Sequence, residues 1–134
     1  MALTWSAELT APAPLRPLDL LTVLGNLVDN ALDAAAAPDL SAADRWVDVE
    51  VVSDAAGLLV QVADGGPGPS DADRGRLFDR GWSTKPVGAA GRGMGLWLTR
   101  RIAEEAGGVV DVATDSGTVF TVEVPRDPRP QEET

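Results

Sequence analysis

The chain has 134 residues, of which 44% are hydrophobic and 24% charged, and this composition is typical of a single globular domain. Its formal net charge of −10 argues against a nucleic-acid partner and against contact with an anionic membrane surface. The sequence contains no cysteine and no histidine, which excludes disulfides, thiolate metal sites and any histidine base, nucleophile or metal ligand within the chain.

The first predicted elements are a strand over residues 3–9 and a long helix that begins at Pro17 and ends near Ala36. The helix carries an apolar stripe at helical spacing, formed by Leu20, Leu24, Leu27, Val28, Ala31, Leu32 and Ala35. Alternating apolar residues then predict strands over residues 46–53 and 58–63, which are joined by a hairpin turn.

The second half begins with residues 64–95, which hold nine of the fourteen glycines and are predicted to be mostly loop. A short helix is expected within this segment, over residues 71–78. A second amphipathic helix follows over residues 94–106, and Gly107 closes it as a C-cap. Two strands joined by a tight turn complete the pattern, at residues 109–114 and 118–125.

This order of elements predicts an α/β (α+β) two-layer sandwich. Two amphipathic helices cover one face of a mixed sheet of about five strands in such an arrangement. We expect one domain over residues 1–125, followed by a charged tail over residues 126–134 that is frayed.

The long helix has an unusual polar face. Asn26, Asp29, Asn30 and Asp33 lie together by helical spacing, opposite the apolar stripe, and Gly25 precedes them. A solvated face would also account for them, although each Asn costs about 0.5–0.7 kcal/mol relative to Ala, and Gly about 1 kcal/mol. Two amide oxygens one turn apart can ligate a hard cation such as Mg²⁺, which keeps water and substrate phosphates as further ligands.

A strand end and a helix start supply further candidate binding residues. Asp64 ends an apolar strand, where its carboxylate can accept a hydrogen bond from a ligand amino group, and Gly66 and Gly68 let the backbone approach a flat ligand. Residues 91–95 carry three glycines before the second helix, and their N–H groups at its positive end form a phosphate cradle. An ordinary turn and a flexible glycine-rich loop are the alternative interpretations.

Basic side chains gather between Arg74 and Arg92 in an otherwise acidic chain. Five cations and one acid lie there, which favours a small polyanion as ligand. Thr84 and Lys85 can reach phosphate oxygens from this segment, and Phe78 can anchor it to the core. A packed loop with a solvated lysine is the alternative interpretation.

Each of these features is weak alone, but their order and spacing are specific. NLVDNALDA, DGGPG, LFDRGWSTK and GRGMGL resemble the N, G1, F and G2 boxes of the Bergerat-fold ATPases, the superfamily of gyrase, the heat-shock chaperone, the mismatch-repair protein and histidine kinase. The chain looks most like the catalytic domain of citrate/fumarate-type two-component sensor histidine kinases. The resemblance implies the Bergerat ATP-binding fold with a Gly-rich ATP lid.

The resemblance also implies a role for each matching residue. Asn30 would be the principal Mg²⁺ ligand and Asn26 would assist it, so that both act in catalysis. Asp64 would accept a hydrogen bond from the adenine amino group, with Gly66 and Gly68 as the wall beside the adenine. The remaining contacts to ATP would come from Thr84, Lys85, Gly91, Arg92, Gly93, Met94, Gly95 and Leu96.

Residues from about 69 to 90 would form the ATP lid in this resemblance. Lys85 and Arg92 are the candidates that would neutralise phosphate charge. Many histidine kinases have a basic residue three positions after the second Asn, but this chain has Asp33 there. The helix therefore supplies no cation at that position, and the lid has to supply it.

Asn26 distinguishes between the activities of this superfamily. Hydrolysing relatives carry a glutamate four residues before the Mg²⁺-binding Asn, as the general base for water. An amide cannot take a proton from water at neutral pH, whereas phosphoryl transfer needs mainly positioning and charge neutralisation. Because the chain has no histidine to phosphorylate, we expect the catalytic domain of a larger sensor histidine kinase, with ATP and Mg²⁺ as cofactors.

The expected partners are ATP, the dimerisation and phosphoacceptor domain of the parent kinase and, through the parent, a cognate response regulator. We expect a cytoplasmic domain that contacts neither nucleic acid nor membrane, in a parent kinase anchored in the plasma membrane. A stand-alone anti-sigma factor serine kinase is one alternative, although such kinases usually carry Glu at the position of Asn26 and lack the F box. A degenerate nucleotide-binding adaptor is another, and the intact Asn30 and Asp64 argue against it.

Overall fold

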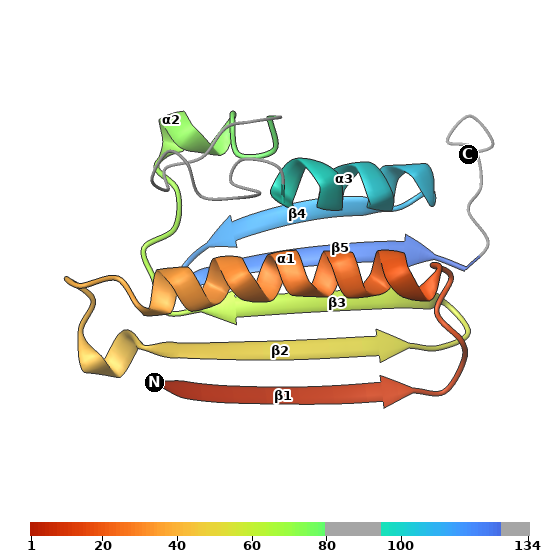
Figure 1. Ribbon diagram of the computed structural model, residues 1–134, viewed down its shortest axis with the longest axis horizontal. Helices are drawn as coiled ribbons and strands as arrows, with labels where there is room; N and C mark the ends of the chain where they lie inside the picture. The colour runs from red at the N-terminus through yellow and green to blue at the C-terminus, as the bar shows by residue number, and fades with distance from the viewer. Residues whose placement is uncertain (80–94, 127–134) are drawn as a thin grey trace.

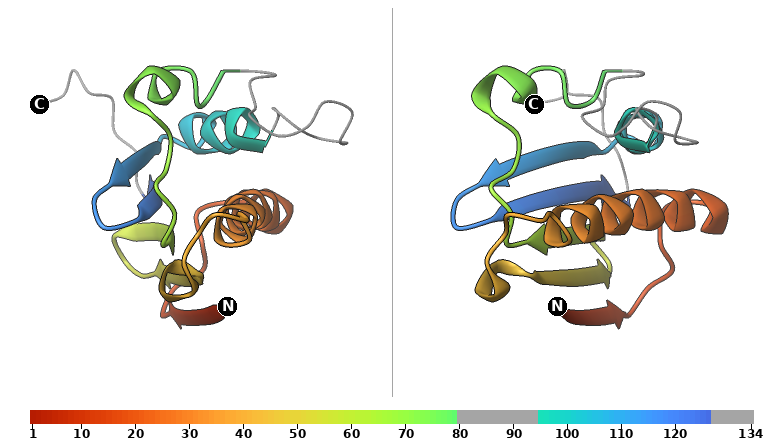
Figure 2. Two further views of the ribbon diagram at one scale, coloured as in Figure 1. Left: turned by 90° about the vertical axis from the view of Figure 1, so that its left-hand side faces the viewer. Right: turned by 60° about the vertical axis from the view of Figure 1, so that its left-hand side comes forward.

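A computed structural model describes residues 1–79 and 95–126 of the chain. The strands are β1 (Ala2–Leu9), β2 (Trp46–Ser53), β3 (Gly57–Asp64), β4 (Val109–Thr114) and β5 (Thr118–Pro125). The helices are α1 (Pro17–Ala35), α2 (Asp71–Arg74) and α3 (Gly95–Glu105), with a single 3₁₀ turn, η1, at Ala42–Asp44. Helices α1 and α3 lie side by side on one face of the sheet (Figures 1 and 2).

The five strands form one mixed sheet in the order β1-β2-β3-β5-β4. The pair β1 and β2 is parallel, because the α1 crossover returns the chain to the end from which β1 began. The pairs β2–β3, β3–β5 and β5–β4 are antiparallel, and tight turns join β2 to β3 and β4 to β5. The predicted two-layer sandwich with a mixed five-stranded sheet is confirmed.

The core lies between the helices and the covered face of the sheet. Helix α1 buries Val23, Leu27, Ala31 and Ala35 fully, and the sheet opposes them with Val47, Val60, Val62, Val122 and Val124. The predicted stripe did not include Val23, while its members Leu20, Leu24, Val28 and Leu32 are only partly buried at the margin.

Among the described residues, no helix combines the length and apolar character needed to span a membrane.

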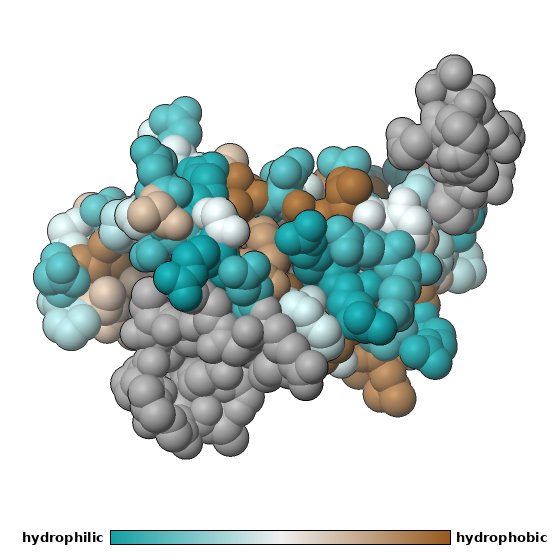
Figure 3. Space-filling model, turned by 90° about the horizontal axis from the view of Figure 1, so that it is seen from above, coloured by the Kyte–Doolittle hydropathy of each residue, from teal (hydrophilic) through white to brown (hydrophobic). Residues whose placement is uncertain are grey.

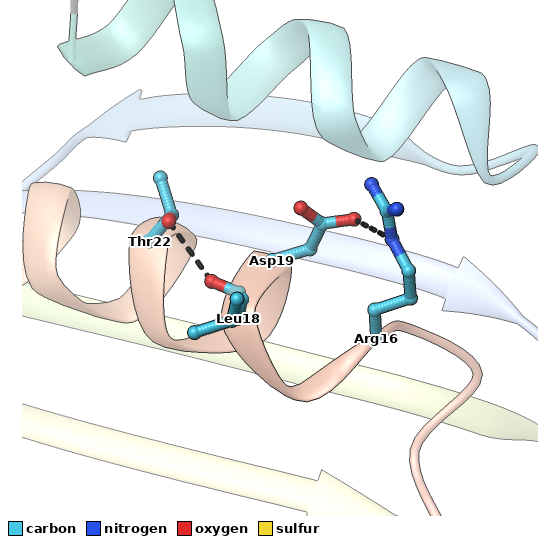
Figure 4. A network of polar contacts seen from close by, with 4 residues as sticks. All are labelled: Arg16, Leu18, Asp19 and Thr22. Carbon is cyan, nitrogen blue, oxygen red and sulfur yellow. Dashed lines mark hydrogen bonds and ion pairs between the residues drawn. The ribbon is translucent and has the colours of Figure 1, made fainter.

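Helix α1 begins where Pro17 predicted it, at the first helical position. Arg16 precedes the helix and pairs with Asp19, the Nε to Oδ2 distance being 3.1 Å (Figure 4). The hydroxyl of Thr22 donates to the carbonyl of Leu18 at 2.9 Å in the same turn (Figure 4). Asp19 is an acid in the first turn, where it complements the positive end of the helix dipole.

The end of α3 confirms the predicted glycine cap. Gly107 adopts a φ of 83°, and its N–H donates to the carbonyl of Glu104 at 3.0 Å. The N–H of Gly108 donates to the carbonyl of Ala103 at 2.7 Å. Together these bonds are a Schellman motif, which satisfies carbonyls that the helix would otherwise leave unpaired and turns the chain into β4.

The end of the sheet departs from one prediction. Arg126, expected in the frayed tail, is tied to the turn between β2 and β3. Its N–H donates to the carbonyl of Ala56 at 3.0 Å, and its guanidinium donates to the carbonyl of Asp54 at 2.7 Å from Nη2. Basic side chains that fold back on a turn can satisfy its carbonyls, and Arg126 is held against the domain in this way.

Candidate functional site

The polar face of α1 is turned toward α3 at Asn26. The side-chain Nδ2 of Asn26 donates to the carbonyl of Gly95 at 3.1 Å and to the hydroxyl of Thr99 at 3.4 Å. Asn26 and Asn30 are half-buried, whereas Asp29 is exposed. A solvated face therefore describes Asp29 but not Asn26, whose amide is part of the contact between the two helices.

Asp64 lies at the end of β3 and is 3% exposed. Burial raises the pKa of this carboxyl group, and the backbone hydrogen bond from Gly66 opposes the rise. The N–H of Gly66 donates to Oδ1 at 2.8 Å. Within the described part of the chain, the other oxygen, Oδ2, accepts no hydrogen bond. The carboxylate therefore has one oxygen fixed by its own turn and one available to a donor on a ligand.

The turn after Asp64 packs against two other elements. A Cβ atom on Gly66 would lie 3.4 Å from the Cβ of Ala34 in α1. A Cβ atom on Gly68, whose φ is 74°, would lie 2.6 Å from the Oγ1 of Thr118 in β5. The turn therefore requires glycine at position 68, whereas a Cβ atom on Gly66 would be tight only against Oδ1 of Asp64, at 3.0 Å. Their role beside a flat ligand stays a prediction.

Thr118 is a site residue that the sequence reasoning missed. It starts β5 directly opposite Asp64, is 3% exposed, and its hydroxyl donates to the carbonyl of Gly66 at 3.3 Å. The available signal was alternation, because Thr118 shares its sheet face with Phe120 and Val122, which are buried. A threonine in a row of buried apolar residues indicates that its hydroxyl group makes a hydrogen bond at that position. Thr99, at an apolar position of α3, gives the same signal.

Helix α1 brings these groups together as a common wall. Asn26 contacts Gly95 at the start of α3, and Ala34 contacts Gly66 two turns later. Asn30 lies midway between them by helical spacing, and the eight residues from 26 to 34 span about 12 Å at 1.5 Å per residue. Amide donors and acceptors thus line the middle of the wall, with a buried carboxyl group at one end.

Several predicted site residues cannot be placed on this wall. Thr84, Lys85, Gly91, Arg92, Gly93 and Met94 lie outside the described residues. Leu96 is described, and it packs against the hydrophobic core. The predicted nucleotide contacts of all seven residues stay predictions. No group of three or more acidic side chains that could hold a metal occurs within residues 1–79 and 95–126.

The segment after Asp64 is anchored to the sheet by Arg74 and Phe78. Helix α2 ends at Arg74 and is shorter than the predicted helix over residues 71–78. The guanidinium of Arg74 donates to the carbonyl of Val112 in β4 at 3.3 Å and also hydrogen-bonds to Thr114, so this cation holds α2 in place. Phe78 packs edge-on against Phe120 with ring centroids 6.3 Å apart, and its predicted anchoring role is confirmed.

A cavity of about 510 Å³ lies against the opposite side of α3 from Thr99. Its lining is mostly charged and comprises Phe78, Asp79, Trp97, Arg100, Arg101, Glu104 and Glu105. The arginines pair with glutamates one turn away, with Nε to Oε2 distances of 3.0 and 3.2 Å. Figure 3 shows that this side of the molecule is mainly hydrophilic. Four of its five charged side chains are thus paired with one another.

Comparison with known proteins agrees with this geometry. Residues 16–128 match the family described as "Histidine kinase-, DNA gyrase B-, and HSP90-like ATPase". The sensor histidine kinase CitA of Klebsiella pneumoniae is 33% identical over 116 residues, which are 85% of this chain and 20% of the relative. The sensor histidine kinase DcuS of Escherichia coli strain K12 is 36% identical over 110 residues, which are 81% of this chain and 19% of the relative.

The fold agrees with solved structures as well. The nucleotide-free catalytic domain of the histidine kinase ThkA superimposes with a TM-score of 0.74 at 23% identity, covering 95% of this chain and 80% of that one. The chain spans about a fifth of the length of the curated relatives it matches. It belongs to the histidine kinase-, DNA gyrase B- and HSP90-like ATPases, and it is a catalytic ATP-binding domain of the sensor histidine kinase type.

Proposed function

We propose that this domain donates the γ-phosphoryl group of ATP to a histidine on a separate dimerisation domain of a larger sensor kinase. The observation that carries the proposal is the fixed amide of Asn26, which stands where hydrolysing relatives have a general base. A carboxamide is not basic enough to take a proton from water at neutral pH. The NH₂ group of Asn26 is held by Gly95 and Thr99. A positioned acceptor histidine needs no such base.

The proposed pose places adenine at Asp64 and the phosphates near the start of α3. Oδ2 of Asp64 would accept from the adenine amino group, and Gly66 and Gly68 would line the adenine. Asn30, assisted by Asn26, would ligate Mg²⁺ through amide oxygens, the type of hard donor that this ion prefers. Bound Mg²⁺ would neutralise negative charge on the phosphates. The about 12 Å between the two ends of the α1 wall is then bridged by the nucleotide.

The segment that joins α2 to α3 completes the proposal. Residues from about 69 to 90 would form a lid over the nucleotide, in which Thr84 and Lys85 contact phosphate oxygens. Arg92 would add a second cation, and the backbone of residues 91–96 would bind the phosphates at the start of α3. Arg74 and Phe78 support this role because they fix the beginning of the segment to β4 and β5.

The partners in this proposal follow the curated relatives. These relatives are sensor kinases, and this favours a two-component system over an anti-sigma factor serine kinase or a degenerate adaptor. The phosphoryl group would pass from the histidine of the parent's dimerisation domain to a cognate response regulator. The domain would lie in the cytoplasm without contacting the membrane or nucleic acid, and the parent kinase would be anchored in the plasma membrane.

Calorimetry with Mg-ATP tests the nucleotide site. We expect binding of Mg-ATP and Mg-ADP, with ATP hydrolysis by the 134-residue chain close to the uncatalysed background. Asn30→Ala should abolish the gain in affinity that Mg²⁺ brings, because it removes the principal amide ligand. Absence of binding at millimolar nucleotide would contradict the site, and rapid hydrolysis would contradict the kinase assignment. Transfer from γ-labelled ATP to the parent's dimerisation domain, added in trans, tests the reaction itself.

A further inference from the structure

The amide of Asn26 can take only one orientation in this structure. Its Nδ2 donates both hydrogens to α3, one to the carbonyl of Gly95 at 3.1 Å and one to the hydroxyl of Thr99 at 3.4 Å. A flipped amide would place Oδ1 against the carbonyl of Gly95, and two acceptors would then face each other. Both hydrogens of the amide nitrogen are therefore donated to α3, and Oδ1 is the atom that can contact a ligand.

Oδ1 of Asn26 accepts no hydrogen bond from any residue that the structure describes. It lies next to the first residue of α3, because a Cβ atom on Gly95 would come within 3.3 Å of both Oδ1 and Cγ. The backbone at the start of α3 is thus packed closely against this amide, and a side chain at position 95 would have to displace it slightly.

Thr99 is the second acceptor, and it occupies a position made for an apolar residue. It is fully buried in α3, on the same stripe as Ala103, which is also fully buried. A β-branched residue is a modest helix former, and a buried hydroxyl is unfavourable unless it is hydrogen-bonded. Valine would fill the same volume without that requirement. The only side-chain hydrogen bond of Thr99 within the described chain is the one from Asn26.

We propose that Thr99 is a positioning residue, whose hydroxyl orients the Asn26 amide so that Oδ1 faces the Mg²⁺ and phosphates of the nucleotide. This inference rests on the proposed function, because it presumes that Asn26 assists in binding the metal-bound phosphates. It adds a residue outside the four sequence motifs to the phosphate end of the site. It also ties the geometry of that end to the position of α3, which begins at the last of the three glycines predicted to bind phosphate.

The test is Thr99→Val, which removes the acceptor and keeps the volume. We expect affinity for Mg-ATP to fall about threefold to tenfold, the range for one lost neutral hydrogen bond. Affinity for adenosine measured in EDTA should not change, because adenine recognition depends on Asp64. The ratio of the two affinities, measured by calorimetry, separates positioning from a general loss of folded protein.

Two variants serve as controls. Thr121→Val removes the acceptor of another amide-to-hydroxyl bond of 3.4 Å, from Gln61, on the outer face of the sheet. It should leave both affinities unchanged. Thr99→Ser keeps the hydroxyl and loses only the methyl group, so it should retain the Mg-ATP to adenosine ratio even if the domain becomes less stable. A ratio in Thr99→Ser as low as in Thr99→Val would overturn the proposal in favour of packing.

A second readout needs no nucleotide. In ¹⁵N-correlated NMR spectra of the free domain, the two side-chain amide protons of Asn26 should shift in Thr99→Val and remain near their original positions in Thr99→Ser. Unchanged Asn26 amide signals in Thr99→Val would overturn the positioning role, whatever the nucleotide affinity. Failure of the unmutated protein to bind Mg-ATP would instead contradict the proposed function, and the NMR result would still decide whether Thr99 holds Asn26.

Discussion

Buried polar side chains concentrate at the candidate nucleotide site. Within the described residues, four polar or charged side chains are buried, namely Ser53, Asp64, Thr99 and Thr118. Three of these four contact site residues, because Thr99 accepts from Asn26 and Thr118 donates to Gly66 beside Asp64. Burial of such groups is unfavourable without hydrogen bonds, and each of these three has one within the domain. Among the described residues, the hydroxyl of Ser53, away from the site, has none.

Asp64→Asn should stabilise the free domain while weakening the binding of ATP. Burial raises the pKa of Asp64 above its unfolded value of 3.8, so the native state binds more protons than the unfolded state in that window. The free energy of unfolding therefore falls as the pH rises from the unfolded pKa through the higher folded pKa of Asp64. Asparagine keeps the acceptor for Gly66 without the buried charge, so the variant should gain stability at pH 7 and show no gain below the unfolded pKa.

Urea unfolding of both proteins between pH 3 and pH 8 measures this difference, with Asp39→Asn, an exposed aspartate in the turn after α1, as the control. Calorimetry with ATP and GTP measures the loss of function. The unmutated domain should prefer ATP, and the variant should lose most of that preference. A stability difference that does not depend on pH, or equal affinity of the unmutated domain for ATP and GTP, would contradict the assigned role of Asp64.

At the scale of elements, Gly25 in α1 is the residue whose presence nothing in the structure explains. A Cβ atom at this position would meet no atom within 4 Å, and the residue is exposed. Gly25→Ala should therefore raise the free energy of unfolding by about 0.8–1 kcal/mol, the difference in helix propensity. Gly95→Ala is the contrasting variant, because its methyl group would lie 3.3 Å from the Asn26 amide and should disturb the site.

Denaturant unfolding and Mg-ATP calorimetry on both variants separate the two glycines. Gly25→Ala should be more stable and bind nucleotide as before, whereas Gly95→Ala should bind Mg-ATP more weakly. A destabilised Gly25→Ala would show that α1 needs flexibility or close approach at this position, which the free domain does not reveal. The result would then assign a conformational role to the glycine that opens the Asn-containing motif.

The elements were predictable from sequence where one period dominates. The stripe of α1 and the alternation in β2, β3 and β5 predicted those elements within about two residues at each end. Val23 was missed because the predicted stripe began at Leu20 and Leu24, although Val23 lies four residues before Leu27 on the row that the helix buries. The strand order and the parallel pairing of β1 were not predicted, since they depend on contacts between segments far apart in sequence.

The candidate site was predictable only in part, because some of its residues are identified by contacts between segments far apart in sequence. Asn26 and Asp64 stood out because their residue types conflict with local propensity or follow an apolar strand. Thr99 and Thr118 conflict with the same patterns more weakly, as single threonines among apolar neighbours, and their partners became evident only from the tertiary structure. A polar β-branched residue at a buried position of a predicted helix or strand is therefore a usable signal for a site residue.

At the scale of the whole molecule, the two long helices leave one face of the sheet open (Figure 2). Part of the acidic charge of the domain falls on this face. The strand register places five acids on this outer face and no lysine or arginine, the acids being Glu8, Asp48, Glu50, Asp111 and Glu123. With a net charge of −10, these carboxylates repel one another in the folded state. Their repulsion is unrelated to the nucleotide wall, which lies on the helix-covered side.

Reversing one of these charges should stabilise the domain in a salt-dependent way. Glu123→Lys should raise the free energy of unfolding by about 0.2–1 kcal/mol at 0.01 M salt, where the Debye length is about 30 Å, and have little effect at 1 M, where it is about 3 Å. Glu123→Gln should give a smaller gain. Glu104→Lys should give none, because Glu104 pairs with Arg100 at 3.0 Å. Equal gains in stability from Glu123→Lys and Glu104→Lys would show that the net charge matters and its location does not. Unchanged Mg-ATP affinity in Glu123→Lys would confirm that the outer face affects stability alone.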